Sequence, residues 1–252
     1  MYSKELFSEK VEQYRNSRPK YACALMDYMK ETFSIDETTT IADIGAGTGI
    51  FTELLLDLGA KVIAIEPNSA MAAQLRLALK CKELEIHERP AESTEIESHT
   101  VDMITAAQSF HWFDQNAFKA ECRRILKGNG PVCLVWNTRI EEAPINVKTA
   151  EIYSAFCPNF KGFIGYGGGV HYSEESISDF FGGKYAKQSY EFPLTYDKQG
   201  FIDRLLSASY ALVEGDRQYD TFVEKLANLF DEFAEDGKVI VPNESVLYYG
   251  TI

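Results

Sequence analysis

Cysteines and long apolar runs are both scarce. Many cysteines would indicate a disulfide-rich protein, and long apolar runs would indicate a membrane protein. The 252 residues include five cysteines, and none of them forms a Cys-x-x-Cys pair or a zinc-binding spacing. No apolar run is long enough to span a bilayer, and the N-terminus has no signal-peptide apolar region. We therefore expect a cytoplasmic protein with free thiols, no metal centre and no membrane partner.

Basic residues are also in the minority. The chain has 25 lysines and arginines against 38 acidic residues, which gives a formal net charge of −13. A balance of this sign repels phosphate backbones, whereas nucleic-acid-binding proteins normally carry a basic face. We therefore expect no nucleic-acid partner. The length and composition are sufficient for one domain with a full core, and they do not indicate an oligomeric state.

Apolar strands alternate with helical segments through the first half of the chain. Beyond a first strand that ends before Gly45, strands are expected at 61–65, 83–88, 101–107 and 131–136, and helices at 50–58, 70–80 and 115–126. This alternation predicts parallel βαβ units in a doubly wound α/β fold. The later residues are less regular: strands are expected at 188–196 and 245–252, and helices up to Phe181, at 201–212 and at 219–234.

A glycine-rich loop follows the first strand and is the most informative motif. It reads Asp43-x-Gly45-x-Gly47-x-Gly49, with Ala46 between the first two glycines. Glycines allow a ligand to approach the main chain and lead it to the positive end of the following helix. A dinucleotide fingerprint would place its third glycine where Ile50 stands, so that ligand is disfavoured. The acidic residue before the loop suits a cationic group such as an ammonium.

A second acidic residue stands at the tip of the next strand. Glu66 precedes Pro67, and Asn68 or Ser69 is placed to cap the helix that begins there. A carboxylate at this position can accept both hydroxyls of a ribose. Ligands in such sheets bind beyond the carboxyl ends of the strands. Asp43, Glu66, Gln108 and the segment after Glu88 all lie at those ends.

These motifs resemble those of class I S-adenosylmethionine-dependent methyltransferases of the type 11 group. Three stretches are similar in particular to trans-aconitate methyltransferase-like small-molecule enzymes: residues 14–19, 107–113 and 123–128. The resemblance implies S-adenosyl-L-methionine as cofactor and S-adenosyl-L-homocysteine as product. It also implies a Rossmann-like, seven-stranded, mostly parallel sheet with an antiparallel edge pair and a helical cap. The acceptor would be a small molecule, with a carboxylate favoured by analogy.

The resemblance also divides the chain, taken as one domain over residues 1–252. The predicted parts are a cofactor-binding core at 35–137, an N-terminal helical lid at 1–34, cap insertions at 138–172 and 197–236, and closing strands at 186–196 and 245–252.

The family pattern assigns the cofactor contacts. Gly45, Gly47 and Gly49 would line the methionine end, Asp43 would hold the ammonium directly or through water, and Glu66 would hold the ribose.

Other cofactor contacts depart from the pattern or have equal alternatives. Pro90 stands where an acid often contacts adenine, so main-chain groups of Ala91, or else Glu92, are expected there; Glu92 could equally cap the next helix. Tyr14 and Arg18 lie in a segment that could fold over the cofactor. Arg18 could bind a carboxylate, either of the methionine end or of an acidic substrate, or it could equally be a surface arginine.

Four residues after the fourth strand would meet both cofactor and acceptor. Gln108 is expected to contact the cofactor, and Phe110 and Trp112 to bind the substrate or to lie in the core. His111 is the candidate general base for an amine or hydroxyl acceptor, whereas a carboxylate acceptor needs no base. Two alternatives are a non-catalytic S-adenosylmethionine-binding module and a nicotinamide-dependent oxidoreductase.

Overall fold

A central seven-stranded sheet organises the protein. The computed structural model describes residues 20–80, 84–163 and 173–252. The strands are β1 (Thr40–Ile44), β2 (Lys61–Ile65), β3 (Leu84–His87), β4 (Met103–Ala107), β5 (Val132–Arg139), β6 (Ala186–Glu191) and β9 (Asn243–Gly250). They lie in the order β3-β2-β1-β4-β5-β9-β6. The first five are parallel, and β9 is antiparallel to β5 and β6. The predicted α/β fold with an antiparallel edge pair is confirmed.

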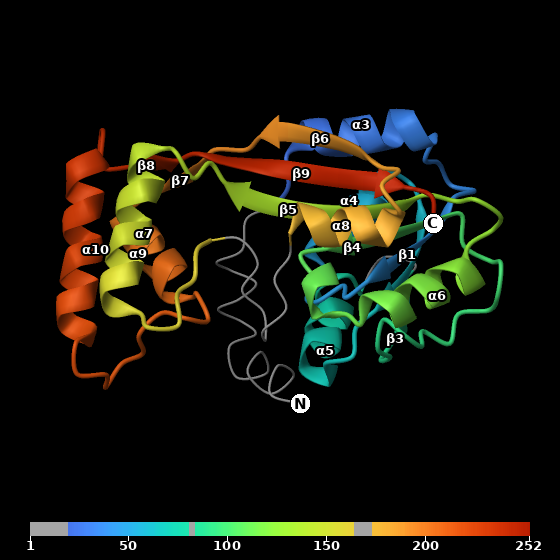
Figure 1. The fold of residues 1–252 in the computed structure, drawn as a ribbon, viewed down its shortest axis with the longest axis horizontal. Helices are drawn as coiled ribbons and strands as arrows, with labels where there is room; N and C mark the ends of the chain where they lie inside the picture. The colour runs from blue at the N-terminus through green and yellow to red at the C-terminus, as the bar shows by residue number, and fades with distance from the viewer. Residues whose placement is uncertain (1–19, 81–83, 164–172) are drawn as a thin grey trace.

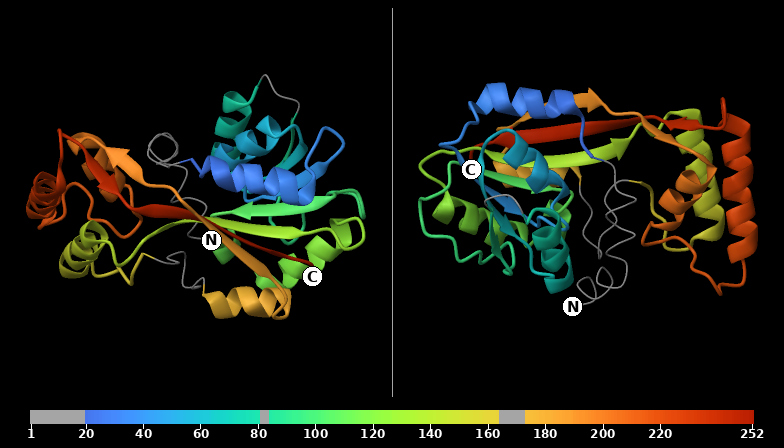
Figure 2. Two further views of the ribbon diagram at one scale, coloured as in Figure 1. Left: turned by 90° about the horizontal axis from the view of Figure 1, so that it is seen from above. Right: turned by 180° about the vertical axis from the view of Figure 1, so that it is seen from behind.

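Helices cover both faces of this sheet because successive strand residues point to opposite sides. The helices on one face are α3 (Cys23–Phe33), α4 (Ile50–Asp57) and α5 (Ser69–Ala78); those on the other are α6 (Gln115–Ile125) and α8 (Glu174–Phe181). In β5, Cys133 and Val135 pack with α3 and α4, while Leu134 and Trp136 pack with α6 and α8. Figure 2 shows the sheet between these two layers.

Local capping fixes where several helices begin. The side chain of Asn68 accepts hydrogen bonds from the N–H groups of Ala70 and Met71 at the start of α5. This confirms the predicted cap and places it on Asn68, the first of the two candidates. Asp114 caps α6 in the same way. Both helices therefore start at the carboxyl edge of the sheet, beside the predicted ligand site.

A second lobe stands beyond the carboxyl end of β5 (Figure 1). It consists of α7 (Pro144–Phe156), α9 (Lys198–Leu206), α10 (Tyr219–Phe233) and a two-stranded sheet of β7 (Leu194–Tyr196) and β8 (Val239–Val241). Its own core is centred on Tyr153, which is fully buried. The lobe is therefore a separate packed layer connected to the sheet through β5, β6 and β9.

Some expected boundaries are wrong in the second half of the chain. The single strand expected at 188–196 is divided, because β6 pairs with β9 whereas β7 pairs with β8 in the small sheet. The last strand begins at Asn243 and ends at Gly250, and α9 ends at Leu206. Of the expected N-terminal lid, residues 1–19 lie outside the described residues, as do 164–172 of the expected cap. None of the helices in the described ranges has the length and apolar character needed to cross a bilayer.

Candidate functional site

The glycine loop after β1 forms the centre of the candidate site. Gly45, Gly47 and Gly49 all have positive φ, at 71°, 59° and 86°. A Cβ on Gly45 would lie 2.5 Å from Cβ of Ser109, and one on Gly49 would lie 3.0 Å from Leu75. These two glycines are therefore needed for packing as well as for backbone conformation.

Gly47 differs from its two neighbours in the loop. A Cβ built on Gly47 meets no heavy atom of the described residues within 4 Å, so this part of the loop borders open space. Its N–H is not directed at that space, because it donates to Oε2 of Glu66 at 2.8 Å. The N–H groups of Gly45 and Ala46 donate to the carbonyl of Ile65 at 2.8 and 3.0 Å. A ligand can therefore approach the main chain closely at Gly47, whereas the N–H groups of Gly45, Ala46 and Gly47 are already hydrogen-bonded within the protein.

Glu66 connects the first two strands at their carboxyl ends. Its Oε2 accepts from Gly47, and its Oε1 accepts from the N–H of Asn68 at 2.8 Å. The side chain is 6% exposed, and Pro67 beside it is half-buried. Two main-chain donors thus fix both carboxylate oxygens beside the open space at Gly47. This geometry suits an acceptor for a vicinal diol.

Asp43 is held below the glycine loop. Asp43 is 1% exposed, and its two carboxylate oxygens accept hydrogen bonds from Thr52 Oγ1 at 2.6 Å and Thr105 Oγ1 at 2.9 Å. Burial raises the pKa of Asp43 from 3.8 to about 6, against the opposing effect of both hydroxyl groups. At neutral pH the group is still mostly a buried anion. Its depth favours an indirect effect on a ligand ammonium, through water or through its field, over direct contact.

The segment after β4 closes the other side of the loop. Gln108 has a positive φ of 57°, and its N–H donates to the carbonyl of Val135 at 2.8 Å. Its Nε2 donates to the carbonyl of Asn137 at 3.1 Å. Ser109 Oγ donates to the carbonyl of Ile44 at 2.7 Å. These bonds hold the carboxyl ends of β1, β4 and β5 together, so Gln108 lies at the predicted edge.

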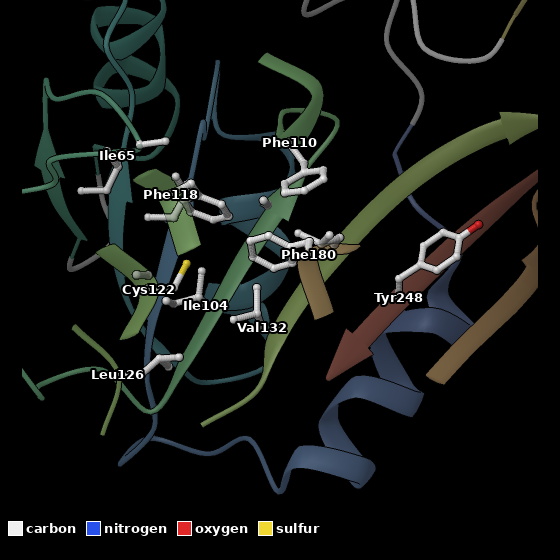
Figure 3. Close-up of a cluster of buried hydrophobic side chains, with 14 of the residues drawn as sticks. Ile65, Ile104, Phe110, Phe118, Cys122, Leu126, Val132, Phe180 and Tyr248 are labelled. Atoms are coloured by element: carbon white, nitrogen blue, oxygen red, sulfur yellow. The ribbon is translucent and has the colours of Figure 1, made fainter. Parts of the chain in front are cut away.

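Phe110 is a core residue, which makes its expected role in substrate binding wrong. The side chain is fully buried, and its ring centroid lies 4.9 Å from that of Phe180 in α8 and 6.2 Å from that of Trp136. Figure 3 shows Phe110, Phe118 and Phe180 in one apolar cluster. Phe110 therefore anchors the short 3-10 helix η1 (Phe110–Trp112) to the sheet.

His111 and Trp112 follow Phe110 in η1 and are not among the residues of that cluster. The two rings lie with their centroids 5.1 Å apart, and Trp112 is 36% exposed. His111 is half-buried at the carboxyl edge of β4. Trp112 is thus accessible to solvent, and His111 is partly so.

The loop after β3 holds the residues expected to contact adenine, Ala91 and Glu92. Ala91 is buried in the sheet core. Oε1 of Glu92 accepts the N–H of Asp114, the capping residue of α6, at 2.8 Å. The alternative role for Glu92, at the start of a helix, matches this contact. Tyr14 and Arg18, the other expected cofactor contacts, lie outside the described residues.

Three residues that the sequence did not single out build the site. Thr52 and Thr105 bind Asp43, and Ser109 fills the space next to Gly45. A signal existed for Thr105, because it is the one hydroxyl residue in β4 and stands in register with Asp43 on β1. Thr52 and Ser109 carry no comparable signal, since serine and threonine are common near helix starts and strand ends.

Comparison with known proteins gives a consistent result for this part of the chain. Residues 42–134 match the family model described as a methyltransferase domain. An uncharacterised methyltransferase-like protein of Schizosaccharomyces pombe is 33% identical over 161 residues, covering 64% of this chain and 62% of the relative. A Saccharomyces cerevisiae protein named as an S-adenosylmethionine-dependent methyltransferase is 30% identical over 129 residues, 46% of this chain and 42% of that one. The chain thus spans less than two thirds of either relative.

A solved structure extends the likeness to the fold of nearly the whole chain. A candidate type II methyltransferase from Anaeromyxobacter dehalogenans aligns with a TM-score of 0.68 and 18% identity. The alignment covers 93% of this chain and 97% of the other. At this identity the likeness shows the fold alone. The specific similarity to trans-aconitate methyltransferases is not among these findings.

Proposed function

We propose that this chain, whose residues 42–134 match the methyltransferase domain family, transfers a methyl group from S-adenosylmethionine to a small molecule. The observation that carries the proposal is the arrangement around Gly47. A buried carboxylate, Glu66, is fixed by two main-chain N–H groups beside a loop surface that is open at Gly47. A second buried carboxylate, Asp43, lies under the same loop.

The residues present fit this cofactor at three points. Glu66 would accept the ribose hydroxyls, and the Gly45–Gly49 loop would border the methionine end, where a side chain on Gly47 would occupy the open space. The buried charge of Asp43 would favour the ammonium. Gln108 holds the β4 edge of the same space. The contact with adenine is assigned to the main chain near Ala91.

The chemistry requires little of the protein beyond orientation. When bound, the cofactor supplies an electrophilic methyl carbon on a sulfonium. The protein must hold the acceptor atom in line, and orientation of this kind can contribute roughly 7–11 kcal/mol. If the acceptor atom is a hydroxyl or an amine, His111 would be the residue that removes its proton. If it is a carboxylate oxygen, which the family analogy favours, no proton has to be removed.

The test is methyl transfer from S-[methyl-³H]adenosylmethionine to a panel of small carboxylic acids, hydroxy acids and amines. Release of S-adenosylhomocysteine that depends on one acceptor supports the proposal. A Glu66→Ala variant should abolish it, because it lacks the carboxylate that would hold the ribose. Tight binding of S-adenosylhomocysteine with no transfer to any acceptor would instead favour the non-catalytic binding module.

A further inference from the structure

The side chain of Asn137 joins three parts of the chain that are distant in sequence. Asn137 lies near the carboxyl end of β5, and its Nδ2 donates to the carbonyl of Lys20 at 2.9 Å, across 117 positions. Its Oδ1 accepts from Oγ of Ser245 on β9 at 2.5 Å. That hydroxyl oxygen in turn accepts the N–H of Ala22 at 3.0 Å. These hydrogen bonds, called the Asn137 clamp below, hold residues 20–22 against the end of β5.

The main chain of Asn137 contacts the proposed cofactor site on its other side. Its carbonyl accepts a hydrogen bond from Nε2 of Gln108 at 3.1 Å. Gln108 has a positive φ of 57°, a conformation that a residue with a side chain keeps only where its surroundings hold it. Such positions are concentrated at functional sites. One residue therefore holds both the strained end of β4 and, through the clamp, residues 20–22.

Tyr21 extends the contacts of residues 20–22 to the glycine loop. Its ring centroid lies 4.9 Å from that of Phe51 in an edge-on arrangement, which is favourable for aromatic pairs. Phe51 is in the first turn of α4, directly after Gly49. Thr52, the next residue, donates its hydroxyl hydrogen bond to Asp43. Residues 20–22 thus contact the helix start that binds Asp43 as well as the strand end that binds Gln108.

Attachment of α3 to the sheet does not by itself require the Asn137 clamp. The helix begins at Cys23, and its apolar face buries Leu25, Met26 and Met29. These side chains pack with the strands in one core cluster and anchor the helix there. The clamp adds a fixed position for the residues just before the helix, relative to Gln108. Its placement is therefore better explained by the site than by the helix.

We propose that Asn137 is a positioning residue of the methyltransferase site, which couples the placement of residues 20–22 to the binding of the cofactor. The inference rests on the proposed function and adds a residue to it. Asn137 acts through Gln108 at the end of β4 and through Tyr21 at the start of α4. By thermodynamic linkage, a cofactor that binds better when the clamp is formed also stabilises the clamp by the same factor.

Calorimetric titration of the full-length chain with S-adenosylhomocysteine tests the first half of this coupling. Asn137→Ala removes both side-chain hydrogen bonds and keeps the main-chain carbonyl that accepts from Gln108. We expect it to bind S-adenosylhomocysteine roughly 5- to 20-fold more weakly, in the lower part of the range for coupled sites. Ser245→Ala should act in the same direction. The double variant should lose less than the two single losses combined, because both side chains belong to one hydrogen-bonded set.

Asn146→Ala is the matched control. Asn146 is 1% exposed, and its Nδ2 donates to the carbonyls of Ile140 and Pro242, both at 2.9 Å. It therefore also joins distant parts of the chain, but it does so beside the second lobe. In urea unfolding both asparagine variants should be less stable than the wild type. Only Asn137→Ala should lose affinity for S-adenosylhomocysteine.

Hydrogen exchange of the wild type tests the other half of the coupling and needs no variant to fold. Saturation with S-adenosylhomocysteine should slow exchange of the Ala22 amide, which donates to Ser245, by about the factor lost in Asn137→Ala. Exchange at Ala22 that the ligand does not slow would overturn the inference. Unchanged affinity in a folded Asn137→Ala, or an equal loss in Asn146→Ala, would overturn it too. Failure of the wild type to bind S-adenosylhomocysteine would count against the proposed function instead.

Discussion

Replacing Asp43 by Asn should stabilise the protein at neutral pH while weakening its proposed ligand site. The carboxyl group is buried, and its two hydrogen bonds come from the neutral hydroxyls of Thr52 and Thr105. Burial raises the pKa of Asp43 from 3.8 to about 6. An asparagine has nearly the same shape, accepts from one hydroxyl and can donate to the other.

The magnitude follows from the two pKa values of Asp43. A difference of about two pH units corresponds to about 3 kcal/mol between the folded and unfolded states. Below about pH 4 the group is protonated in both states and has no effect on stability. As the pH rises from about 4 to about 6, the unfolded chain loses the proton first, so the stability that this group contributes is lost over that window. Asp43→Asn should therefore match the wild type near pH 4 and exceed it by up to about 3 kcal/mol at pH 7.

Urea unfolding of both proteins between pH 4 and 8, followed by circular dichroism, measures this difference directly. Asp27→Asn, which changes an exposed aspartate of α3, controls for the loss of one negative charge. A stability difference between Asp43→Asn and the wild type that is the same at every pH would refute the reasoning. The variant should also bind S-adenosylhomocysteine more weakly, because the buried charge that favours the ammonium is gone.

Four other substitutions separate folding from binding. Phe110→Ala should lower the free energy of unfolding by about 3–5 kcal/mol and leave the affinity for S-adenosylhomocysteine nearly unchanged; a normal melting temperature would contradict its core position. His111→Ala should leave that affinity nearly intact while lowering turnover, and unchanged turnover with the true acceptor would remove His111 from the catalytic residues. Gly47→Ala should reduce the affinity for S-adenosylhomocysteine in calorimetry, because its Cβ would occupy the open space proposed for the ligand. Gly45→Ala should mainly lower the stability in thermal melts, because its Cβ would lie 2.5 Å from Ser109. Equal losses of affinity in both glycine variants at unchanged stability would contradict this distinction.

The parts of the fold that depend on local signals were predictable. The strand before Gly45, the strand ending at Ile65 and the cap at Asn68 all follow from neighbouring residues, and the structure has each of them. The antiparallel edge was predicted only through the family resemblance. The short strands β7 and β8 were not resolved in the sequence, because three residues give no clear alternation and their pairing spans more than forty positions.

The roles of individual site residues depended on contacts distant in the chain. Phe110 was expected at the pocket because it follows a strand end, but Phe180, seventy positions later, covers its ring. The loop glycines have one sequence signature, yet only the positions of Ser109 and Leu75 distinguish packing glycines from the open Gly47. Asp43 was recognised as an acid at the site, while its depth and its two threonine partners required the folded sheet.

Calorimetric titration of the purified chain with S-adenosylhomocysteine, with NAD and NADP as controls, tests the central claim most directly. We predict saturable binding of S-adenosylhomocysteine at micromolar concentration, no binding of either dinucleotide, and loss of binding in Glu66→Ala. Binding of NAD or NADP in its place would contradict the account, and so would binding of S-adenosylhomocysteine that is unaffected by the loss of Glu66.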